Sequence, residues 1–93
     1  MIDGYFASAG TQYHVDISVL RRVAVCESGY NTYARNGPYA GMFQFASSTW
    51  VATRATMGLS TDPDLRFNPE QAIDTAAFKI AAGEGKQAWP GCY

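Results

Sequence analysis

The residue whose type and position most directly indicate chemistry is Glu27, a carboxylate at the end of an apolar stripe. Residues 17–28 carry aliphatic side chains at helical spacing, among them Leu20 and Val23. At about 100° per residue, Glu27 lies about 20° from Leu20 and about 40° from Val23 around the helix axis, so its side chain should face inward. Apolar surroundings raise the pKa of a carboxyl group, which can then act as a general acid near neutral pH.

A plainer interpretation of Glu27 is also compatible with its position. A glutamate at the end of a helix can turn into solvent, or it can form an ion pair with a neighbour such as Arg35. Perturbed carboxyl groups occur in structural ion pairs as well as in active sites. Spacing alone therefore leaves the catalytic and the structural interpretations open.

Four helical segments are expected to position Glu27. They are predicted over residues 4–14, 17–28, 47–57 and from Pro69 onward. Asp16 is expected to cap the second of them and Asn68 the last. The expected helix ends are Gly29, Gly58, and for the last helix Gly83 and Gly85. The residues of the third helix available for burial are Trp50, Val51, Ala55 and Met57.

The segment between the second and third helices combines turn residues with aromatic side chains. Residues 29–46 contain several glycines and asparagines among Tyr30, Tyr33, Tyr39, Phe43 and Phe45. This mixture is typical of turns around a tiny β-hairpin. Residues 58–67 read as a connector, and His14, which has no nucleophile motif near it, is interpreted as structural.

The composition limits the classes of function. The chain has 93 residues with 47% hydrophobic content, which suits one domain over residues 1–93. Its seven Lys and Arg are scattered and its net charge is -1, so neither nucleic acid nor a membrane surface is an expected partner. The chain contains no membrane-spanning apolar run and no signal peptide at Met1–Gly4. No metal or other cofactor is expected. The protein is expected to be a monomer.

The two cysteines, Cys26 and Cys92, are too few for a four-ligand zinc site and too far apart for a redox pair. A disulfide is their simplest use, and closing such a long loop would stabilise the fold by about 4 kcal/mol. That use favours an oxidising, extracytoplasmic compartment. The alternative is a pair of buried, reduced thiols.

Three short segments together resemble the goose-type lysozyme and lytic transglycosylase superfamily. They are residues 26–31 (CESGYN), 41–45 (GMFQF) and 47–50 (SSTW), and the similarity extends from about Tyr13 to Cys92. The subset most similar to this chain comprises compact, disulfide-bearing domains like the resuscitation-promoting factors and phage-associated transglycosylases. In that subset a cysteine precedes the catalytic glutamate and pairs with one near the C-terminus, which implies a Cys26–Cys92 bond here.

The resemblance implies a role for each matching residue. Glu27 would protonate the glycosidic oxygen between N-acetylmuramic acid and N-acetylglucosamine, then accept the proton of the muramic C6 hydroxyl to leave a 1,6-anhydro end. Gln44 would bind the sugar near the scissile bond, and Met42 and Phe43 would shape the cleft wall. Ser28 would orient Glu27 or contact muramic substituents. Alternatively, Ser28 satisfies carbonyls at the helix end, and Met42 and Phe43 are ordinary core.

Aromatic side chains in the same segment are candidates for stacking on sugar faces. We expect Tyr33 and Tyr39 to line the cleft and Trp50 to belong to the core. The chain departs from many transglycosylases at residues 81–85 (AAGEG), where those relatives have a tyrosine that contacts the glutamate. The resemblance therefore does not say which group holds Glu27 in place.

A second catalytic carboxylate has few candidates. Glycosidases with two carboxylates hold them about 5 to about 10 Å apart, whereas Asp16 would lie about 16 Å from Glu27 along the helix. The remaining aspartates, Asp3, Asp62, Asp64 and Asp74, belong to no motif. This scarcity favours a mechanism assisted by a substrate group.

The sequence thus predicts a mainly α, lysozyme-like domain with an aromatic loop or tiny β-hairpin beside the cleft. Its predicted function is cleavage of peptidoglycan glycan strands, outside the cytoplasm, by lytic transglycosylation. Two alternatives stay open, namely a hydrolytic lysozyme and a non-catalytic peptidoglycan-binding or virion-structural domain.

Overall fold

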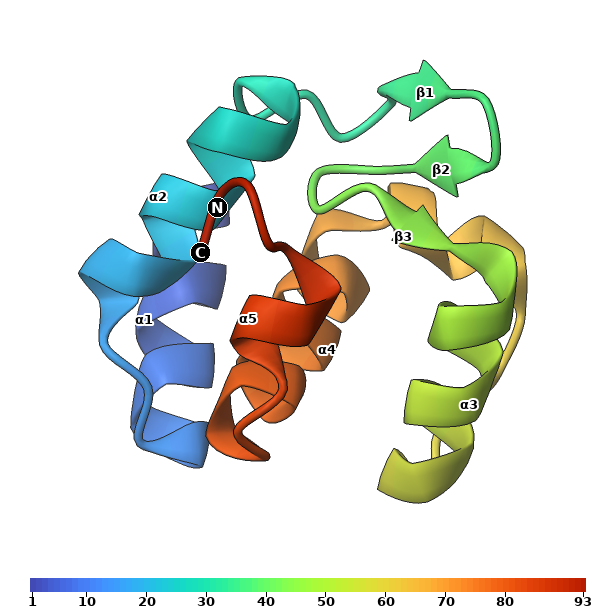
Figure 1. The fold of residues 1–93 in the computed structure, drawn as a ribbon. Helices are drawn as coiled ribbons and strands as arrows, with labels where there is room; N and C mark the ends of the chain where they lie inside the picture. The colour runs from blue at the N-terminus through green and yellow to red at the C-terminus, as the bar shows by residue number, and fades with distance from the viewer.

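Five α-helices, one 3-10 helix and a three-stranded sheet make up the fold in the computed structural model, which describes residues 1–93 (Figure 1). In chain order the elements are α1 (Ile2–Tyr13), α2 (Ile17–Ser28), β1 (Arg35–Asn36), β2 (Tyr39–Ala40), β3 (Phe45–Ala46), α3 (Ser47–Met57), η1 (Pro63–Phe67), α4 (Pro69–Ala81) and α5 (Gly85–Ala88). Helix α1 packs on α2 and α4, and α3 contacts α4, η1 and β3. The prediction of a mainly helical fold with a small β element is confirmed.

The predicted helix caps are present at α2 and α4. The Asp16 side chain accepts a hydrogen bond from the Ser18 amide at 2.9 Å, and Asn68 accepts one from the Gln71 amide at 3.0 Å. Gly29 ends α2 in a left-handed conformation with φ of 62°. Each cap satisfies an amide that the first turn of a helix leaves free.

The C-terminal part differs from the prediction at Gly85. Gly83 follows α4 with φ of 80°, as expected of a helix end, but Gly85 begins α5 rather than ending a helix. The glycine at this position is needed for a close approach rather than a helix end, because a Cβ on Gly85 would lie 2.5 Å from the Tyr93 ring. The connector over 58–67 likewise contains a helix, η1, whose N-cap Asp62 accepts a hydrogen bond from the Asp64 amide at 3.0 Å.

The aromatic segment forms an antiparallel sheet in the order β1-β2-β3. Asn36 pairs with Tyr39 across the first turn, and Ala40 pairs with Phe45 across the second. Gly41 and Gln44 both have positive φ in the second turn, at 84° and 54°. The β element therefore has three strands, one more than the predicted hairpin. Its second turn faces the end of α2.

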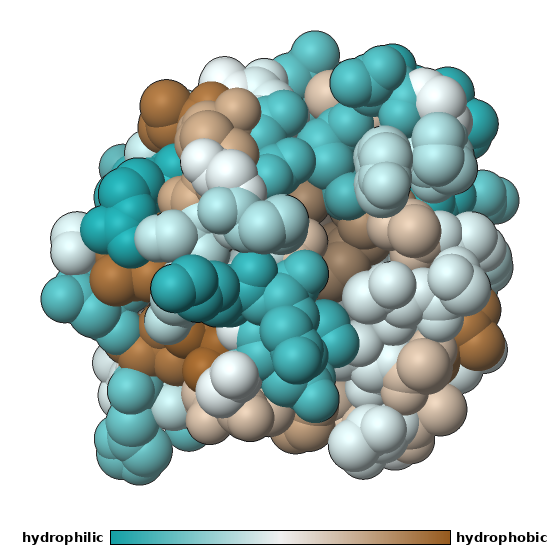
Figure 2. All heavy atoms as spheres, in the orientation of Figure 1, coloured by the Kyte–Doolittle hydropathy of each residue, from teal (hydrophilic) through white to brown (hydrophobic).

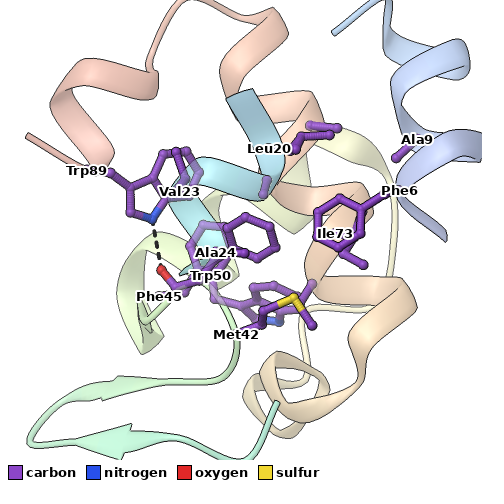
Figure 3. Packing of buried hydrophobic residues seen from close by; sticks show 14 residues of the cluster. Phe6, Ala9, Leu20, Val23, Ala24, Met42, Phe45, Trp50, Ile73 and Trp89 are labelled. Atoms are coloured by element: carbon purple, nitrogen blue, oxygen red, sulfur yellow. Dashed lines mark hydrogen bonds between the residues drawn. The ribbon is translucent and has the colours of Figure 1, made fainter. Parts of the chain in front are cut away.

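The core gathers aromatic side chains from the sheet, α3 and the C-terminal segment (Figure 3). Trp50 is fully buried, as predicted, and lies 5.2 Å from Phe45 in edge-to-face geometry. Trp89 packs on Phe45 and Phe43, and its indole Nε1 donates to the Phe43 carbonyl at 2.8 Å. These contacts attach the C-terminal segment to the sheet.

The predicted burial of Val51 and Ala55 is wrong. Both are exposed, and α3 instead buries Thr53 and Arg54 beside Trp50. The Arg54 guanidinium donates to the Ser60 carbonyl and to side chains of α4, so this polar residue is buried with its hydrogen bonds made.

A disulfide joins Cys26 to Cys92, as predicted, and links the end of α2 to the C-terminal segment. In Figure 1 this segment passes beside α2. None of the helices has the length and apolar character needed to cross a membrane.

Candidate active site

Glu27 lines an open pocket of about 340 Å³. The other lining residues come from the sheet and the C-terminal segment: Asn36, Tyr39, Gln44, Ala88, Trp89, Pro90 and Gly91. The pocket therefore lies where three separate parts of the chain meet, namely the end of α2, the sheet, and the segment from α5 to Gly91. The core contacts of Trp89 and the Cys26–Cys92 disulfide hold the third part in place.

The Glu27 side chain is partly buried, and burial raises the pKa of its carboxyl group above the ordinary 4.5. No ion pair opposes this shift, because the two salt bridges of the structure join Arg21 to Asp3 and Lys79 to Glu84. The alternative partner, Arg35, lies over the Phe67 ring at 5.5 Å instead. Glu27 thus has the inward position and the direction of pKa shift expected of a general acid.

Glu27 is the only carboxyl group among the residues that line this pocket. Asp3 pairs with Arg21 at 2.8 Å, and Asp62 caps η1. Asp74 lies on α4, where burial is the main cause of a raised pKa. The four aspartates considered as a second acid are thus absent from the wall around Glu27.

A second hollow of about 240 Å³ continues from the first and shares four of its residues, Tyr39, Gln44, Ala88 and Trp89. It adds Phe45, Ala46, Thr49 and Gln87, so it runs between α5 and the start of α3. Figure 2 shows this region as a recess with tan to brown, apolar atoms at its floor, between the teal surface of α5 and the paler surface of α3. Together the two hollows form a groove with Glu27 in its first part, a shape suited to an extended ligand.

Tyr39 lines both hollows and is 48% exposed, so part of its side chain is accessible to a ligand. Tyr33, which was expected beside it, is 77% exposed and lines neither hollow. It precedes the sheet, in the turn between α2 and β1. The structure therefore brings together Glu27 and Tyr39 but leaves Tyr33 outside.

The amide of Gln44, which the resemblance places against the sugar, also has partners within the protein. Its Nε2 donates to the Gly41 carbonyl at 2.8 Å and to the Ala34 carbonyl at 3.2 Å. Both bonds use the amide nitrogen, which fixes the orientation of the side chain and leaves Oε1 as an acceptor. Gln44 still lines both hollows, so a ligand would meet a preoriented acceptor there.

Three other predicted contacts prove to be internal. Met42 and Phe43 are fully buried in the core, so their side chains do not form the surface of the groove. The Ser28 hydroxyl donates to the Met42 carbonyl at 2.7 Å and accepts from the Asn31 amide at 3.1 Å. For these residues the structural alternative holds, because the second turn of the sheet packs directly on the end of α2.

Sequence reasoning missed the wall formed by Asn36 and residues 88–91. A signal for the second part was present, because a disulfide from Cys26 to Cys92 places the residues before Cys92 beside Glu27. Asn36 had no such signal. Its position follows from its pairing with Tyr39 in the sheet.

Most of the chain matches one known protein family. Residues 15–92 match the model of the family described as "Transglycosylase-like domain". The chain belongs to this family. The matched range of the transglycosylase-like domain includes Glu27, the whole sheet and both cysteines.

A relative is the peptidoglycan transglycosylase gp16 of Escherichia phage T7, which is 38% identical to the transglycosylase-like domain over 86 residues. The alignment covers 90% of this chain but only 6% of the phage protein. No solved structure is significantly similar to the chain.

Proposed function

We propose that this transglycosylase-like domain cleaves the β-1,4 bond between N-acetylmuramic acid and N-acetylglucosamine in peptidoglycan. The observation that carries the proposal is Glu27, a carboxyl group with a raised pKa that lines a groove of extended shape. A protonated carboxyl group can donate to the oxygen of a glycosidic bond as that bond breaks. The family and the phage relative named for peptidoglycan support this substrate.

In the proposed reaction Glu27 acts twice. It first protonates the glycosidic oxygen, so that the N-acetylglucosamine side leaves with a hydroxyl group. It then accepts the proton of the muramic C6 hydroxyl while that oxygen attacks C1, which forms a 1,6-anhydro ring and restores the protonated acid. One carboxyl group is sufficient because the substrate supplies the nucleophile, in agreement with the single acid that lines the pocket.

The groove walls supply binding and orientation in this proposal. The exposed face of Tyr39 stacks on a sugar ring, whose apolar face is buried while its hydroxyl groups stay at the rim. The Gln44 Oε1 accepts from a sugar hydroxyl near Glu27, and Asn36 contributes a further amide. Holding the bond close to the acid accelerates the step by lowering its entropic cost.

Mass spectrometry of the products tests the proposal. Purified peptidoglycan incubated with the domain is expected to yield muropeptides with 1,6-anhydromuramic ends, which are one water lighter than reducing ends. Reducing ends would instead identify a hydrolytic lysozyme. Intact strands that retain the domain would identify a binding module without catalysis.

The rate of cleavage is expected to fall as pH rises through the raised pKa of Glu27, because only the protonated carboxyl group can donate. Burial moves this decline to a pH above the ordinary 4.5 of a glutamate. Release of soluble muropeptides as a function of pH measures it. Asp74→Asn is the matched control, since Asp74 also has a raised pKa but lies outside the groove. If the decline disappears in Asp74→Asn, the titrating group is Asp74 and not Glu27.

The disulfide supports a place of action outside the cytoplasm. Disulfides persist in oxidising compartments such as the bacterial periplasm and are rare where thiols are kept reduced. Peptidoglycan lies outside the cytoplasmic membrane, so the proposed substrate and the Cys26–Cys92 bond point to the same compartment.

A further inference from the structure

Arg66, near the end of η1, connects this helix to the sheet that forms one wall of the groove. Arg66 is only 7% exposed. Its Nε donates to the Pro63 carbonyl within η1 at 2.8 Å. Its Nη1 donates to the Phe45 carbonyl at 2.9 Å and to the Pro38 carbonyl at 3.3 Å. One side chain therefore connects η1 to both the first turn and the third strand of the sheet.

The backbone of η1 holds the sheet at two further points. Gly41 lies so close to it that a Cβ would be 1.9 Å from the Arg66 carbonyl oxygen. The Thr32 hydroxyl donates to the Phe67 carbonyl at 2.8 Å, just before the sheet begins. These contacts lie before the sheet and in its second turn, between Tyr39 and Gln44, so η1 supports this wall of the groove at several points.

The guanidinium of Arg66 forms no salt bridge. Burial, with a smaller effect of the nearby Arg35, lowers its pKa, and Asp64 only partly opposes this shift. Burying a charge without a counter-ion is costly unless several hydrogen bonds compensate the lost hydration. For Arg66 the compensation comes from three backbone carbonyls, two of which belong to the sheet.

We propose that Arg66 is a positioning residue of the active site, which holds the wall containing Tyr39 and Gln44 at the separation from Glu27 that a sugar requires. The end of α2 is joined directly to the second turn of the sheet by the Ser28 hydroxyl, which donates to the Met42 carbonyl, whereas Arg66 bonds to the first turn and to β3. Loosening Arg66 therefore moves the wall relative to the acid without touching either the acid or the ligand. This inference rests on the proposed function.

The test compares Arg66→Lys with Arg54→Lys. Arg54 is a matched control because it is 2% exposed and also makes three hydrogen bonds, but its acceptors, Ser60, Gln71 and Thr75, line neither hollow. A lysine keeps the charge but cannot reach three carbonyls in different directions. With soluble glycan strands as substrate, Arg66→Lys is expected to raise KM about tenfold with a smaller change in kcat. Arg54→Lys is expected to lose stability while KM stays unchanged.

Coupling to Tyr39 separates a positioning role from a merely structural one. If Arg66 acts through the wall, Tyr39→Ala removes much of what Arg66 positions. The effects of Arg66→Lys and Tyr39→Ala on kcat/KM are then expected to be clearly less than multiplicative, whereas Arg54→Lys and Tyr39→Ala multiply. Amide hydrogen exchange over residues 36–45 is expected to accelerate in Arg66→Lys and not in Arg54→Lys.

If Arg66→Lys does not fold, Thr32→Val provides a milder loosening of the same support, since it removes only the bond to the Phe67 carbonyl. Thr32→Val is expected to raise KM roughly two- to threefold. Its effect and that of Tyr39→Ala on kcat/KM are again expected to be less than multiplicative. If the wild-type domain is active but the effects of the variants multiply, or the variants leave KM unchanged, the role proposed for Arg66 is overturned and the proposed function is not. A wild-type domain that neither binds nor cleaves glycan would overturn the proposed function and this inference together.

Discussion

Replacing Glu27 with glutamine is expected to reduce glycan cleavage about 100- to 10,000-fold, the range that a general acid contributes. Glutamine preserves the size of the side chain and its position in the pocket, but its amide does not release a proton to a leaving oxygen. In the proposed reaction the same group also accepts a proton, so both halves of the step are lost. Release of muropeptides from peptidoglycan measures the effect.

The Glu27→Gln domain is expected to fold as well as the wild type. Burial raises the pKa of Glu27 in the folded state above the unfolded value of about 4.5, so the folded state holds its proton more tightly. The stability of the wild type relative to Glu27→Gln should therefore fall as pH rises from the unfolded pKa through the folded one. At neutral pH the neutral amide removes an unfavourable buried charge.

Glu70→Gln is the matched control for Glu27→Gln, because Glu70 is exposed in the first turn of α4 and lines neither hollow. It is expected to cleave at the wild-type rate. Full activity in Glu27→Gln would show that another group is the acid. Loss of activity together with loss of the folded state would assign Glu27 a structural role instead.

Removing the disulfide, by Cys26→Ser with Cys92→Ser, is expected to lower the free energy of unfolding by about 4 kcal/mol. The bond connects residues 66 positions apart, so its loss gives the unfolded chain considerable conformational freedom. This is a large fraction of the stability of a small domain. Urea unfolding of the wild type and the double variant, in the absence of reductant, measures the difference.

The same variant tests whether the bond also shapes the groove. Pro90 and Gly91 line the pocket beside Glu27, between the buried Trp89 and Cys92. Without the bond this wall loses its covalent link to α2 and keeps only weaker contacts such as the hydrogen bond from Arg22 to the Tyr93 carbonyl, so cleavage by molecules that remain folded is expected to fall too. A dithiol reductant should destabilise the wild type and leave the double variant unaffected. Equal unfolding midpoints for the two proteins would contradict the stabilising role.

The elements that sequence reasoning predicted correctly depend on local interactions. Asp16 and Asn68 cap helices through amides two and three residues away, so the residue types and their spacing contain the information. The inward direction of Glu27 follows in the same way from the period of one helix. The predictions that were wrong, such as which residues of α3 are buried, concern features that depend on the neighbours each helix packs against. Arg54 is buried because Gln71 and Thr75 of α4 bond to it.

The candidate site divides along the same line. Residue type, position and resemblance pointed to Glu27 as the candidate acid and predicted the Cys26–Cys92 bond, which the structure contains. The longer-range partners of Ser28 and Gln44 could not be predicted, because they are backbone carbonyls that only the fold brings close: Met42 lies 14 residues from Ser28, and Ala34 lies 10 from Gln44. Every residue has the same backbone carbonyl, so no pattern of side chains predicts such a bond.

The amino-acid sequence by itself determined the four longer helices, the caps of two of them and the inward direction of Glu27, since these follow from neighbours within a turn or two. Only the tertiary structure decided what surrounds Glu27: which aromatic ring lines the groove, which residues form its far wall, and what supports that wall from behind. Arg66 illustrates the physical reason, because its partners Pro38 and Phe45 lie 28 and 21 residues away. Contacts over such separations form only when the whole core is packed.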